Sequence, residues 1–478
     1  MNTEYKISGE KPLSFGKTKE IWAVEHHDDL IIMKNTDATT ADNDASKTQL
    51  ILDKGKCATI TTSRIFELLE QAGIPTAYVQ QLSDTEILAK KCTMLPLEVI
   101  IRRFDDGSSL ERKPHRKTTG NPHRFHRLVF ELFLKTSKGK LGEMDLRNYL
   151  PLDKEDLIKY LNVEKSLKEI NEKRVEKKLP KITKLMELSH AELIEEAIKL
   201  IDDPWIANPY DIENWTLKHP KKPEWEIPQL TTMNGLTIVK PDQLKKIEEL
   251  TRKTFLILEG AWNTLGYRLI DFKIEFGIDA DDNLLIADVI DNDSWRLRTA
   301  DWKELSKQNF RDGHPLAQVQ EKYVRVAELT NQLRIPQQAI IFWRGSDKDE
   351  LESFHKMRSI TYEDVVISGH KSPNKALQKL EDLHAQYPEG AVIIAIVGMS
   401  NGLGPTDSAR TYWPVLSYCN TAKTNPEDVW SSLRMPSEVP NATFLNIKNA
   451  YLAALNILAA KNPIAYMNRQ LAIEKLDE

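Results

Sequence analysis

The strongest constraint on the fold is a regular alternation of polar and apolar side chains in the sequence DFKIEFG, residues 271–277. Because successive side chains of a strand point to opposite faces, this alternation predicts a strand with one charged face and one apolar face. The charged face carries Asp271, Lys273 and Glu275. A turn at residues 281–283 would pair this strand with the next apolar stretch and place Asp288 beside Glu275, so the sequence predicts an antiparallel hairpin.

The two carboxylates of this predicted hairpin suit a metal ion. Glu275 and Asp288 would offer hard oxygen ligands of the kind that Mg²⁺ prefers, especially where the ion already carries phosphate oxygens. The alternation by itself favours a solvent-exposed hairpin whose charges pair with one another. This stretch alone leaves both interpretations open.

Length and composition bound the class of protein. The chain has 478 residues, of which 41% are hydrophobic and 29% charged, so it is long enough for two or three cores. Its net charge of −5 argues against a nucleic-acid-binding protein and is compatible with small anionic substrates. The three cysteines lack metal-ligand spacing and favour a reducing compartment. No apolar run has the length of a signal peptide core or a membrane span, so we expect a cytoplasmic protein without a membrane partner.

The first ninety residues are predicted to form an antiparallel sheet and one helix. Strands at residues 20–24 and 30–33 flank a polar turn, which indicates a hairpin. A helix is expected over residues 63–71, because Gly73 and Pro75 provide a stop.

Gly16 lies in the sequence SFGKTKEIW, which resembles a phosphate-binding P-loop only superficially. A P-loop requires a second glycine five residues earlier, where this chain has Lys11, and a helix afterwards, where this chain predicts a strand. A glycine-containing β-hairpin that lays backbone amides and Lys17 or Lys19 over nucleotide phosphates is the better interpretation.

Residues 95–114 place two arginines at the end of an apolar strand and then a Gly-Ser turn. Arg102 would bind a phosphate or carboxylate through parallel N–H groups, Gly107 would allow close backbone approach, and Ser108 would donate a hydroxyl. An ordinary surface turn is the alternative that the composition allows equally.

Residues 137–202 differ in character from the sequence around them. They are rich in lysine and glutamate, with leucines and isoleucines at helical spacing, which predicts inserted helices. Ser189 with Glu192 forms the pattern of a helix capping box. A basic face here would suit RNA or a partner protein, whereas a solvated helical hairpin with paired surface charges is the simpler interpretation.

The C-terminal part begins after a helix predicted at residues 315–333, and we place the domain boundary at residue 334. Beyond it, three apolar strands alternate with helical stretches, which predicts a parallel α/β sheet whose ligands lie at the carboxyl ends of the strands. The polar motifs at those ends are Gly345-Ser346, Ser368-Gly369-His370-Lys371 and Ser400-Asn401-Gly402. They are expected to converge on one crevice, where backbone amides would bind phosphate.

His370 is the only histidine of this set. An imidazole exchanges protons readily near physiological pH, which favours general acid or base chemistry. A purely structural role is the alternative, and the residues alone do not decide between the two.

Taken together, these stretches resemble one known family. The N-terminal part contains GKTKEIW, AGIPTAY, SDTEILAKK, MLPLEVIIRR, DGSSLERK, FELFLK, DFKIEFG and ADVIDNDSWRL, and the C-terminal part contains GSDKD, SGHKSP, SNGLGP and DVWSSLRMP. In this order they are similar to the fused, animal-type enzymes of de novo purine synthesis, in which phosphoribosylaminoimidazole-succinocarboxamide synthetase is joined to phosphoribosylaminoimidazole carboxylase. The resemblance covers nearly everything except residues 137–202.

The resemblance implies a fold and an assembly. An α+β synthetase domain is expected at residues 1–334, with an antiparallel-sheet nucleotide-binding lobe and a mixed lobe. An α/β three-layer parallel-sheet carboxylase domain is expected at residues 335–478. The family also implies a homo-octamer built around the carboxylase domains, with aminoimidazole ribonucleotides, aspartate and CO₂ as small-molecule partners.

The implied synthetase reaction joins carboxyaminoimidazole ribonucleotide to aspartate at the expense of ATP, through an acyl phosphate. On this sequence, the residues implied to cover ATP are Gly16, Lys17 and Lys19, and those implied to hold Mg²⁺ are Glu275 and Asp288. Lys135 and Lys273 are implied near the phosphates. The residues implied to bind the ribonucleotide or aspartate are Arg102, Gly107, Ser108, Asp203, Ser294 and Arg296.

The implied carboxylase reaction adds CO₂ to C4 of aminoimidazole ribonucleotide without ATP or biotin. His370 is implied to carry the C4 proton, which must leave to restore aromaticity. The residues implied to hold the substrate are Gly345, Ser346, Asp349, Ser368, Lys371, Ser400, Asn401 and Gly402.

The sequence departs from the family pattern mainly in the carboxylase part. Lys348 stands where the family has a second serine, Gly369 where it has alanine, and Met399 where it has arginine. Three functions therefore stay open at this stage. They are the two-step purine enzyme, a synthetase whose C-terminal domain serves only assembly, and a related carboxylate-amine ligase of specialised nucleotide metabolism.

Overall fold

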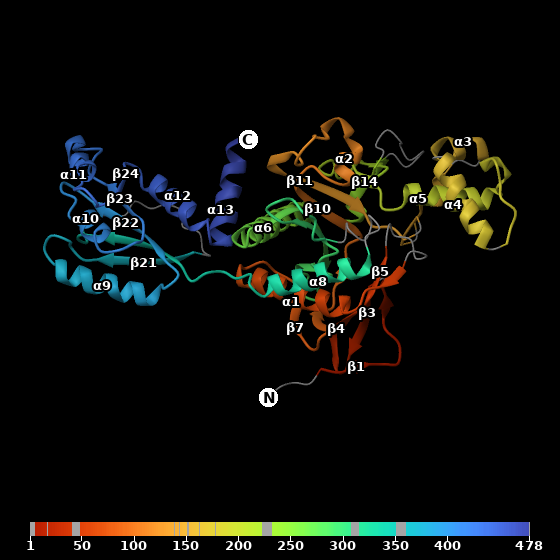
Figure 1. Ribbon diagram of the computed structural model, residues 1–478, viewed down its shortest axis with the longest axis horizontal. Coiled ribbons are helices and arrows are strands. Elements are labelled where there is room, and N and C mark those ends of the chain that lie inside the picture. The colour runs from red at the N-terminus through yellow and green to blue at the C-terminus, as the bar shows by residue number, and fades with distance from the viewer. Residues whose placement is uncertain are drawn as a thin grey trace. The chain divides into compact units, whose positions relative to one another are not determined.

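The computed structural model describes residues 5–16, 18–40, 48–137, 139–142, 144–150, 153–161, 163–176, 178–221, 232–306, 315–349 and 360–477. Lys17, one of the residues implied to cover ATP, lies outside them. The chain forms two compact units (Figure 1). The N-terminal unit comprises Met1–Phe66, Pro75–Arg252 and Leu269–Asn331, and the C-terminal unit Glu67–Ile74, Lys253–Arg268 and Gln332–Glu478. Within the described part of the chain, no helix is both long enough and apolar enough to cross a membrane.

The first sheet of the N-terminal unit has six antiparallel strands. Its order is β1 (Ile7–Ser8), β3 (Lys19–Val24), β4 (His27–Asn35), β8 (Glu86–Lys90) and β7 (Tyr78–Gln81), with β2 (Ser14–Phe15) paired to β3. The predicted hairpin is confirmed, because Ile21 lies opposite Met33 in the β3 and β4 pair. Beside this sheet, β5 (Ala38–Thr40) and β6 (Thr48–Leu50) form a short ribbon.

The helix α1 (Lys54–Gln71) begins well before the predicted start at residue 63. The amide of Gly55 donates a hydrogen bond of 2.9 Å to the carboxylate of Asp37, which satisfies one of the free N–H groups at the helix start. This partner lies outside the helix, so the local sequence could not reveal it.

The second sheet of the N-terminal unit has nine strands. Its main path is β16 (Thr232–Met233), β15 (Trp215–Lys218), β14 (Trp205–Ile206), β11 (Arg124–Leu134), β10 (Leu97–Phe104), β17 (Arg268–Ile278) and β18 (Leu284–Ala287). Two further strands, β9 (Thr93–Met94) and β19 (Trp295–Arg298), pair with β17. The predicted hairpin is confirmed by the antiparallel register of Gly277 with Leu285. Asp271 and Glu275 are only 4% and 5% exposed, so the alternative of a solvent-exposed hairpin is wrong.

The helices of the N-terminal unit include α2 (Ser108–Arg112), much of α6 (Pro241–Thr264) and α8 (Leu316–Thr330). Val319 and Tyr323 of α8 pack against Ile51 and Cys57 in a small apolar cluster. The helix expected at residues 315–333 therefore exists, and its apolar face is buried as its periodicity predicts.

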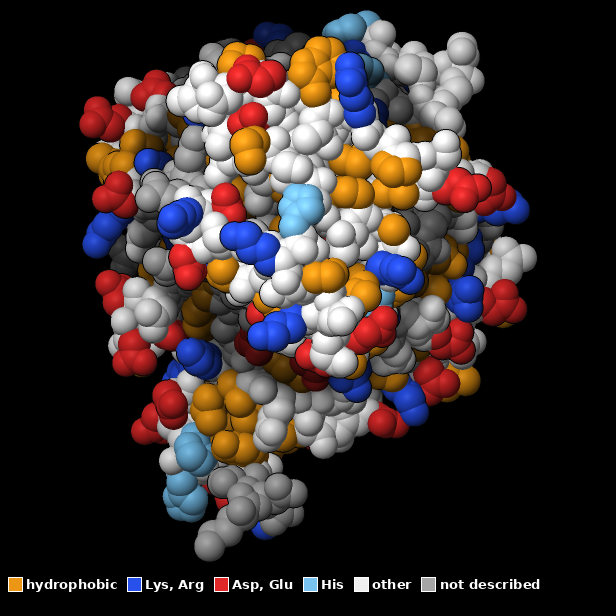
Figure 2. Space-filling model, turned by 90° about the vertical axis from the view of Figure 1, so that its left-hand side faces the viewer, with side chains coloured by type: hydrophobic (Ala, Val, Ile, Leu, Met, Phe, Trp, Pro, Cys, Tyr) orange, Lys and Arg blue, Asp and Glu red, His pale blue; other side chains and the backbone are white. Residues whose placement is uncertain are grey.

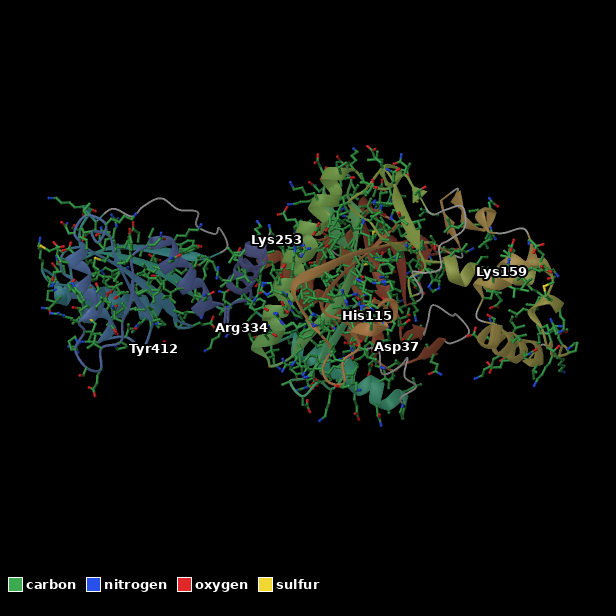
Figure 3. All side chains as sticks on the ribbon, turned by 90° about the horizontal axis from the view of Figure 1, so that it is seen from above. Asp37, His115, Lys159, Lys253, Arg334 and Tyr412 are labelled. Atoms are coloured by element: carbon green, nitrogen blue, oxygen red, sulfur yellow. The ribbon has the colours of Figure 1, made fainter. Side chains whose placement is uncertain are left out.

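The lysine- and glutamate-rich segment is helical, as expected. It contains α3 (Lys154–Tyr160), α4 (Val163–Glu176) and α5 (His190–Ile201), preceded by the ribbon of β12 (Lys140–Leu141) and β13 (Met144–Asp145). The capping box is confirmed, because the Ser189 amide donates to the Glu192 carboxylate at 2.8 Å and the Glu192 amide donates to Ser189 Oγ at 3.2 Å. Figure 3 shows the side chains of this segment, with Lys159 of α3 labelled.

The C-terminal unit is built on the predicted parallel sheet of five strands. Their order is β21 (Thr361–Val366), β20 (Ala339–Arg344), β22 (Ala391–Val397), β23 (Val415–Cys419) and β24 (Ala442–Phe444). The helices are α9 (Pro373–Gln386), α10 (Leu403–Ser408), α11 (Trp430–Leu433), α12 (Ile447–Leu458) and α13 (Pro463–Glu474). One face of the sheet packs its Ile341 and Ile393 side chains against Leu380 of α9, whereas α12 lies against the sheet from the other side (Figure 1). The three-layer α/β fold is therefore confirmed.

Candidate active sites

Lysine and carboxylate side chains meet on the polar face of the second sheet. Lys135, directly after β11, lies 2.6 Å and 2.5 Å from the two carboxylate oxygens of Glu275. Lys273 of β17 lies 2.7 Å from Glu98 and 3.7 Å from Glu275. Burial favours a raised pKa for Glu275, but the charges of Lys273 and Lys135 outweigh it and lower the pKa. Lys135 and Lys273, which the resemblance implies near the phosphates, therefore lie around Glu275.

Lys19 reaches the same polar face from the first sheet. The amide of Gly16 donates to the Lys19 carbonyl at 2.8 Å, which closes the tight turn between β2 and β3. The Lys19 ammonium forms an ion pair with Asp288, whose backbone has a left-handed φ of 65°. Burial lowers the pKa of Lys19 to about 8, against the opposing charges of Glu275 and Asp291. The glycine hairpin thus brings a lysine to the predicted carboxylate pair.

The residues present fit a magnesium ion. Glu275 and Asp288 offer hard oxygen ligands. The charges of both carboxylates act on the Lys19 ammonium group. Among the residues that the structure describes, no group of three or more histidine, cysteine, aspartate or glutamate side chains could hold a metal ion. Two carboxylates suit an ion that takes its remaining ligands from phosphate oxygens and water.

The arginines expected to bind an anion lie in a buried network. Arg102 donates to Glu131 at 2.7 Å, to Asp271 at 2.6 Å and to the Ser108 hydroxyl at 3.0 Å. Arg296 also pairs with Asp271. Because Arg102 is only 1% exposed, it positions Ser108 and Asp271, whereas the less buried Arg296 is the better placed of the two to meet a ligand.

Gly107 is required by this network. Its backbone has a φ of 58°, and a Cβ at this position would lie 2.0 Å from Nη2 of Arg296. Only glycine therefore lets the guanidinium of Arg296 lie against the turn that starts α2. The sequence predicts that Gly107 allows another group to approach the backbone closely. In the structure, that group is the guanidinium of Arg296.

Ser294 and Asp203 complete the set of predicted synthetase residues. The carbonyl of Ser294 accepts a bond of 2.7 Å from the Lys273 amide, and its hydroxyl donates to the Val289 carbonyl at 3.1 Å. Asp203 accepts a bond of 2.9 Å from the Thr136 amide. Burial, together with the charge of Glu98, raises the pKa of Asp203 to about 6.

Sequence reasoning missed several carboxylates of this site. Glu98 pairs with Lys273 and Glu131 with Arg102, and each is the single acidic residue of its strand. A single acid within an apolar strand was an available signal, because a buried charge needs a partner. The partner itself depends on strand register, which the sequence did not provide.

In the C-terminal unit, the predicted motifs lie at the carboxyl ends of neighbouring strands. His370 follows β21, and a Cβ on Gly402, which follows β22, would lie 2.2 Å from Nε2 of His370. The indole of Trp343 in β20 donates to the Ile367 carbonyl at 3.0 Å, which ties the end of β20 to the loop after β21. The predicted convergence of the loops at this edge is therefore present, with the imidazole exposed.

The other predicted residues of this edge have distinct roles in the structure. Ser346 donates to Asp349 at 3.0 Å within a turn beside Gly345, and the Lys371 amide donates to the Ser368 hydroxyl at 3.1 Å. Lys348 is exposed rather than packed inside this turn.

Asn401 is buried, in contrast to the exposed Ser400 beside it. Its amide nitrogen donates to the Ser417 hydroxyl at 2.8 Å and to the Ser432 hydroxyl at 3.0 Å. Asn401 therefore shapes the loop that presents Gly402.

The N-terminal unit carries a cluster of lysines and carboxylates, and the C-terminal unit carries a glycine-rich loop edge with an exposed histidine. These two candidate sites indicate the class of a two-site enzyme. A family model for SAICAR synthetase matches residues 12–176 and 212–329, and one for AIR carboxylase matches residues 340–475. Because the first model alone matches more than half of the chain, the chain belongs to the SAICAR synthetase family, and its C-terminal part carries the AIR carboxylase domain. The fusion predicted from the motifs is confirmed.

Known relatives share this arrangement. The probable multifunctional protein ADE2 of Caenorhabditis elegans is 29% identical over 480 residues, covering 95% of this chain and 91% of that protein. The bifunctional phosphoribosylaminoimidazole carboxylase/phosphoribosylaminoimidazole succinocarboxamide synthetase of Drosophila melanogaster is 28% identical over 501 residues, covering 99% of this chain and 96% of that protein. A solved SAICAR synthetase (Type-2) in complex with ADP is 22% identical, with a TM-score of 0.44, and the match covers 67% of this chain and 98% of that chain. This chain is accordingly a multifunctional enzyme of purine biosynthesis, a ligase and a carboxylase.

Proposed function

We propose that the N-terminal unit joins carboxyaminoimidazole ribonucleotide to aspartate with ATP, and that the C-terminal unit carboxylates aminoimidazole ribonucleotide. The observation that supports the ligation best is the cluster of Lys19, Lys135 and Lys273 around Glu275 and Asp288. Cations gathered beside paired carboxylates are what phosphoryl transfer from a nucleotide requires.

The ligation needs an activated carboxylate, because an amine does not displace an oxygen anion. The γ-phosphoryl group moves from ATP to the substrate carboxylate, and the amine of aspartate then displaces phosphate to form the amide. Lys19 and Lys135 stabilise the charge on the transferred group, and the amides of the turn at Gly16 cover the nucleotide. Mg²⁺, when bound to Glu275 and Asp288, would offset phosphate charge during the transfer.

Anionic parts of the substrates are assigned to the arginine network. Arg296 lies between Gly107 and Asp271, and Ser108 stands at the start of α2. We assign Arg296 and Ser108 to the ribonucleotide or aspartate, with Arg102 positioning them from the interior. Ser294 supports Lys273 through its backbone carbonyl.

The carboxylation is assigned to the loops at the carboxyl edge of the parallel sheet. CO₂ forms a C–C bond to C4 of the aminoimidazole, and the C4 proton then leaves to an acceptor. His370 is exposed at this edge and lies against Gly402, so we assign it as that acceptor. Gly345, Ser346 and Asp349 are assigned to phosphate and ribose, and Ser368, Lys371, Ser400 and Asn401 to the rest of the pocket. Neither biotin nor ATP takes part in this step.

We place the domain boundary at residue 334, because one family match ends at residue 329 and the next begins at residue 340. We also retain residues 137–202 as an insertion. The family match covers part of this segment and is interrupted at residues 177–211. The three cysteines are free, which supports a reducing compartment such as the cytoplasm.

We also propose a homo-octamer through the C-terminal units. Met399 and Tyr412 are 79% and 78% exposed, and Leu433 and Leu445 are each 55% exposed, which leaves apolar area for contacts between copies. Figure 3 labels Tyr412, and Figure 2 shows hydrophobic side chains among charges of both signs on one face of the molecule. Sedimentation equilibrium would give eight times the chain mass, and a monomer would contradict the proposal.

The ligation is tested by supplying carboxyaminoimidazole ribonucleotide, aspartate, ATP and Mg²⁺ and measuring ADP and the succinocarboxamide product by mass spectrometry. Both products should appear together and should depend on aspartate. ADP release with another nucleotide or amine, but not with this pair, would instead favour a ligase of specialised metabolism.

A further inference from the structure

Asp203 lies just before β14, next to the segment after β11 that carries Lys135. The register of β11 with β14 pairs Phe133 with Trp205, and the Leu134 amide donates to the Pro204 carbonyl at 3.0 Å. Lys135 directly follows Leu134 in the chain, and Asp203 directly precedes Pro204. Asp203 is therefore on the same edge as the lysine that binds Glu275.

Two reciprocal hydrogen bonds hold the carboxylate and the backbone amide of Asp203 to Thr136. The Thr136 amide donates to Asp203 Oδ1 at 2.9 Å, and the Asp203 amide donates to the Thr136 hydroxyl at 2.9 Å. The backbone of Asp203 has a φ of 50°, a left-handed conformation that non-glycine residues rarely adopt. Strain of this kind persists where surrounding contacts over-determine it, and it is common at active sites.

The charges around Asp203 differ from those around the other carboxylates of the site. Glu98 of β10 pairs with Lys273 at 2.7 Å, Glu275 of β17 pairs with Lys135, and Asp288 pairs with Lys19. No lysine or arginine forms an ion pair with Asp203 in the part of the chain that the structure describes.

The groups that face Asp203 are Glu98 of β10, its neighbour Asp202, and Lys273 of β17. Burial, followed by the charge of Glu98, raises the pKa of Asp203 to about 6, while the Thr136 amide opposes the increase. Asp203 is half-buried, so it remains within reach of a bound molecule. A carboxylate of this kind is ionised at neutral pH and is a stronger base than an ordinary aspartate.

We propose that Asp203 is a catalytic residue of the ligation, the base that takes the proton from the attacking amine. This proposal rests on the proposed ligase function of the N-terminal unit. The neutral amine nitrogen forms the new C–N bond, the C–O bond to phosphate breaks, and phosphate leaves with the electron pair. The surplus proton on nitrogen moves to Oδ2 of Asp203, which leaves a neutral amide.

A purely structural role is the competing explanation, and Asp202 provides the matched control. The Asp202 carboxylate accepts bonds from the Thr136 hydroxyl and, at 3.0 Å, from the Gly139 amide, so it holds the same two segments together. The variant Asp202→Asn perturbs this connection and keeps Asp203. If Asp203 acted only by holding the segments, the two asparagine variants would behave alike.

The test separates formation of the acyl phosphate from its capture by aspartate. Parent, Asp203→Asn and Asp202→Asn enzymes receive carboxyaminoimidazole ribonucleotide, ATP and Mg²⁺, with either aspartate or hydroxylamine. Hydroxylamine is a weakly basic nucleophile whose surplus proton passes readily to water, so it does not need the enzyme base. Asp203→Asn should form the hydroxamate within about threefold of the parent rate and lose about 100-fold in succinocarboxamide formation, the scale of general base catalysis.

A pH profile provides the second readout. In the parent, kcat/KM for aspartate should show an additional decrease below about pH 6 as Asp203 takes up a proton. The ratio of parent to Asp203→Asn activity should therefore fall as the pH drops through 6, and Asp203→Glu should restore part of this dependence.

Two results would overturn the assignment of Asp203. They are equal loss of hydroxamate and succinocarboxamide in Asp203→Asn, and equal behaviour of the two asparagine variants. Absence of hydroxamate from the parent enzyme would be a different failure, because it would reject the ligase function itself.

Discussion

At the scale of the residue, Lys19 shows how burial tunes the charge of a binding group. Its ammonium pairs with Asp288 while its side chain is largely removed from water, and burial lowers its pKa to about 8. A lysine with this pKa loses its positive charge at mildly alkaline pH. The nucleotide phosphates that we assign to it would then lose a cationic partner.

We predict an alkaline limb in the use of ATP that belongs to Lys19. The value of kcat/KM for ATP should fall as the pH rises through about 8, because the free enzyme loses the Lys19 proton. Lys19→Arg should remove this limb, since a guanidinium stays charged over the whole range. Lys56→Arg, at an exposed lysine paired with Asp84, is the control and should leave the profile unchanged. An alkaline limb that persists in Lys19→Arg would contradict the assignment.

Gly107 allows a second prediction at this scale. Alanine there would carry the penalty of a left-handed backbone, roughly 1–2 kcal/mol, and would also displace Arg296 from the turn. Gly107→Ala should lower the thermal midpoint and raise KM for the ribonucleotide about tenfold or more, as expected for the loss of one charged contact. Gly142→Ala shares the φ of 58° but has no atom within 4 Å of the added Cβ, so it should affect only stability. Equal KM values in both variants would reject a binding role for Arg296.

Individual side chains also show what the sequence could not provide. The motifs identified Arg102 and Asp271 but not their bond, because Arg102 lies opposite Asp271 only through the register of β10 with β17. The pairing of Glu131 with Arg102 likewise depends on the register of β10 with β11. The partners of buried charges depend on pairings between strands that are distant in sequence.

At the scale of the element, the prediction succeeded where local pattern decides the outcome. The hairpin of β17 and β18 follows from period-two alternation and a polar turn, and the capping box at Ser189 follows from local spacing. The start of α1 was misplaced because Asp37, far from the helix in sequence, bonds to Gly55. Local propensity could not include that contact.

The loop after β22 supports a prediction about the carboxylase site. A Cβ on Gly402 would lie 2.2 Å from Nε2 of His370, although the backbone φ of −90° accepts any residue. Gly402→Ala should therefore push the imidazole aside and reduce carboxylation at least tenfold, with ligation unchanged, since proton transfer depends on placement. Gly398→Ala is the control, because its Cβ would approach no atom more closely than Thr421 Cγ2 at 3.3 Å. Carboxylation by ¹³C-bicarbonate incorporation distinguishes the two, and normal activity of Gly402→Ala would contradict the role of His370.

At the scale of the whole molecule, the two units have unlike folds and separate sets of candidate site residues. The antiparallel sheets of the N-terminal unit hold the lysine and carboxylate cluster, and the parallel sheet of the C-terminal unit presents His370 at its carboxyl edge. The change from alternating strands to buried apolar strands predicted this division from the sequence. We therefore expect that single substitutions can remove each activity without the other.

The most direct test uses mass spectrometry on two reactions run side by side, one started from aminoimidazole ribonucleotide with bicarbonate and one from carboxyaminoimidazole ribonucleotide. Both contain ATP, Mg²⁺ and aspartate, and the non-enzymatic carboxylation is subtracted. The parent should give succinocarboxamide product from both starts, His370→Asn only from the carboxylated start, and Glu275→Gln from neither, while Glu275→Gln still accumulates the carboxylated intermediate. Loss of both activities in either folded variant, or no carboxylation by the parent, would contradict two independent active sites in one chain.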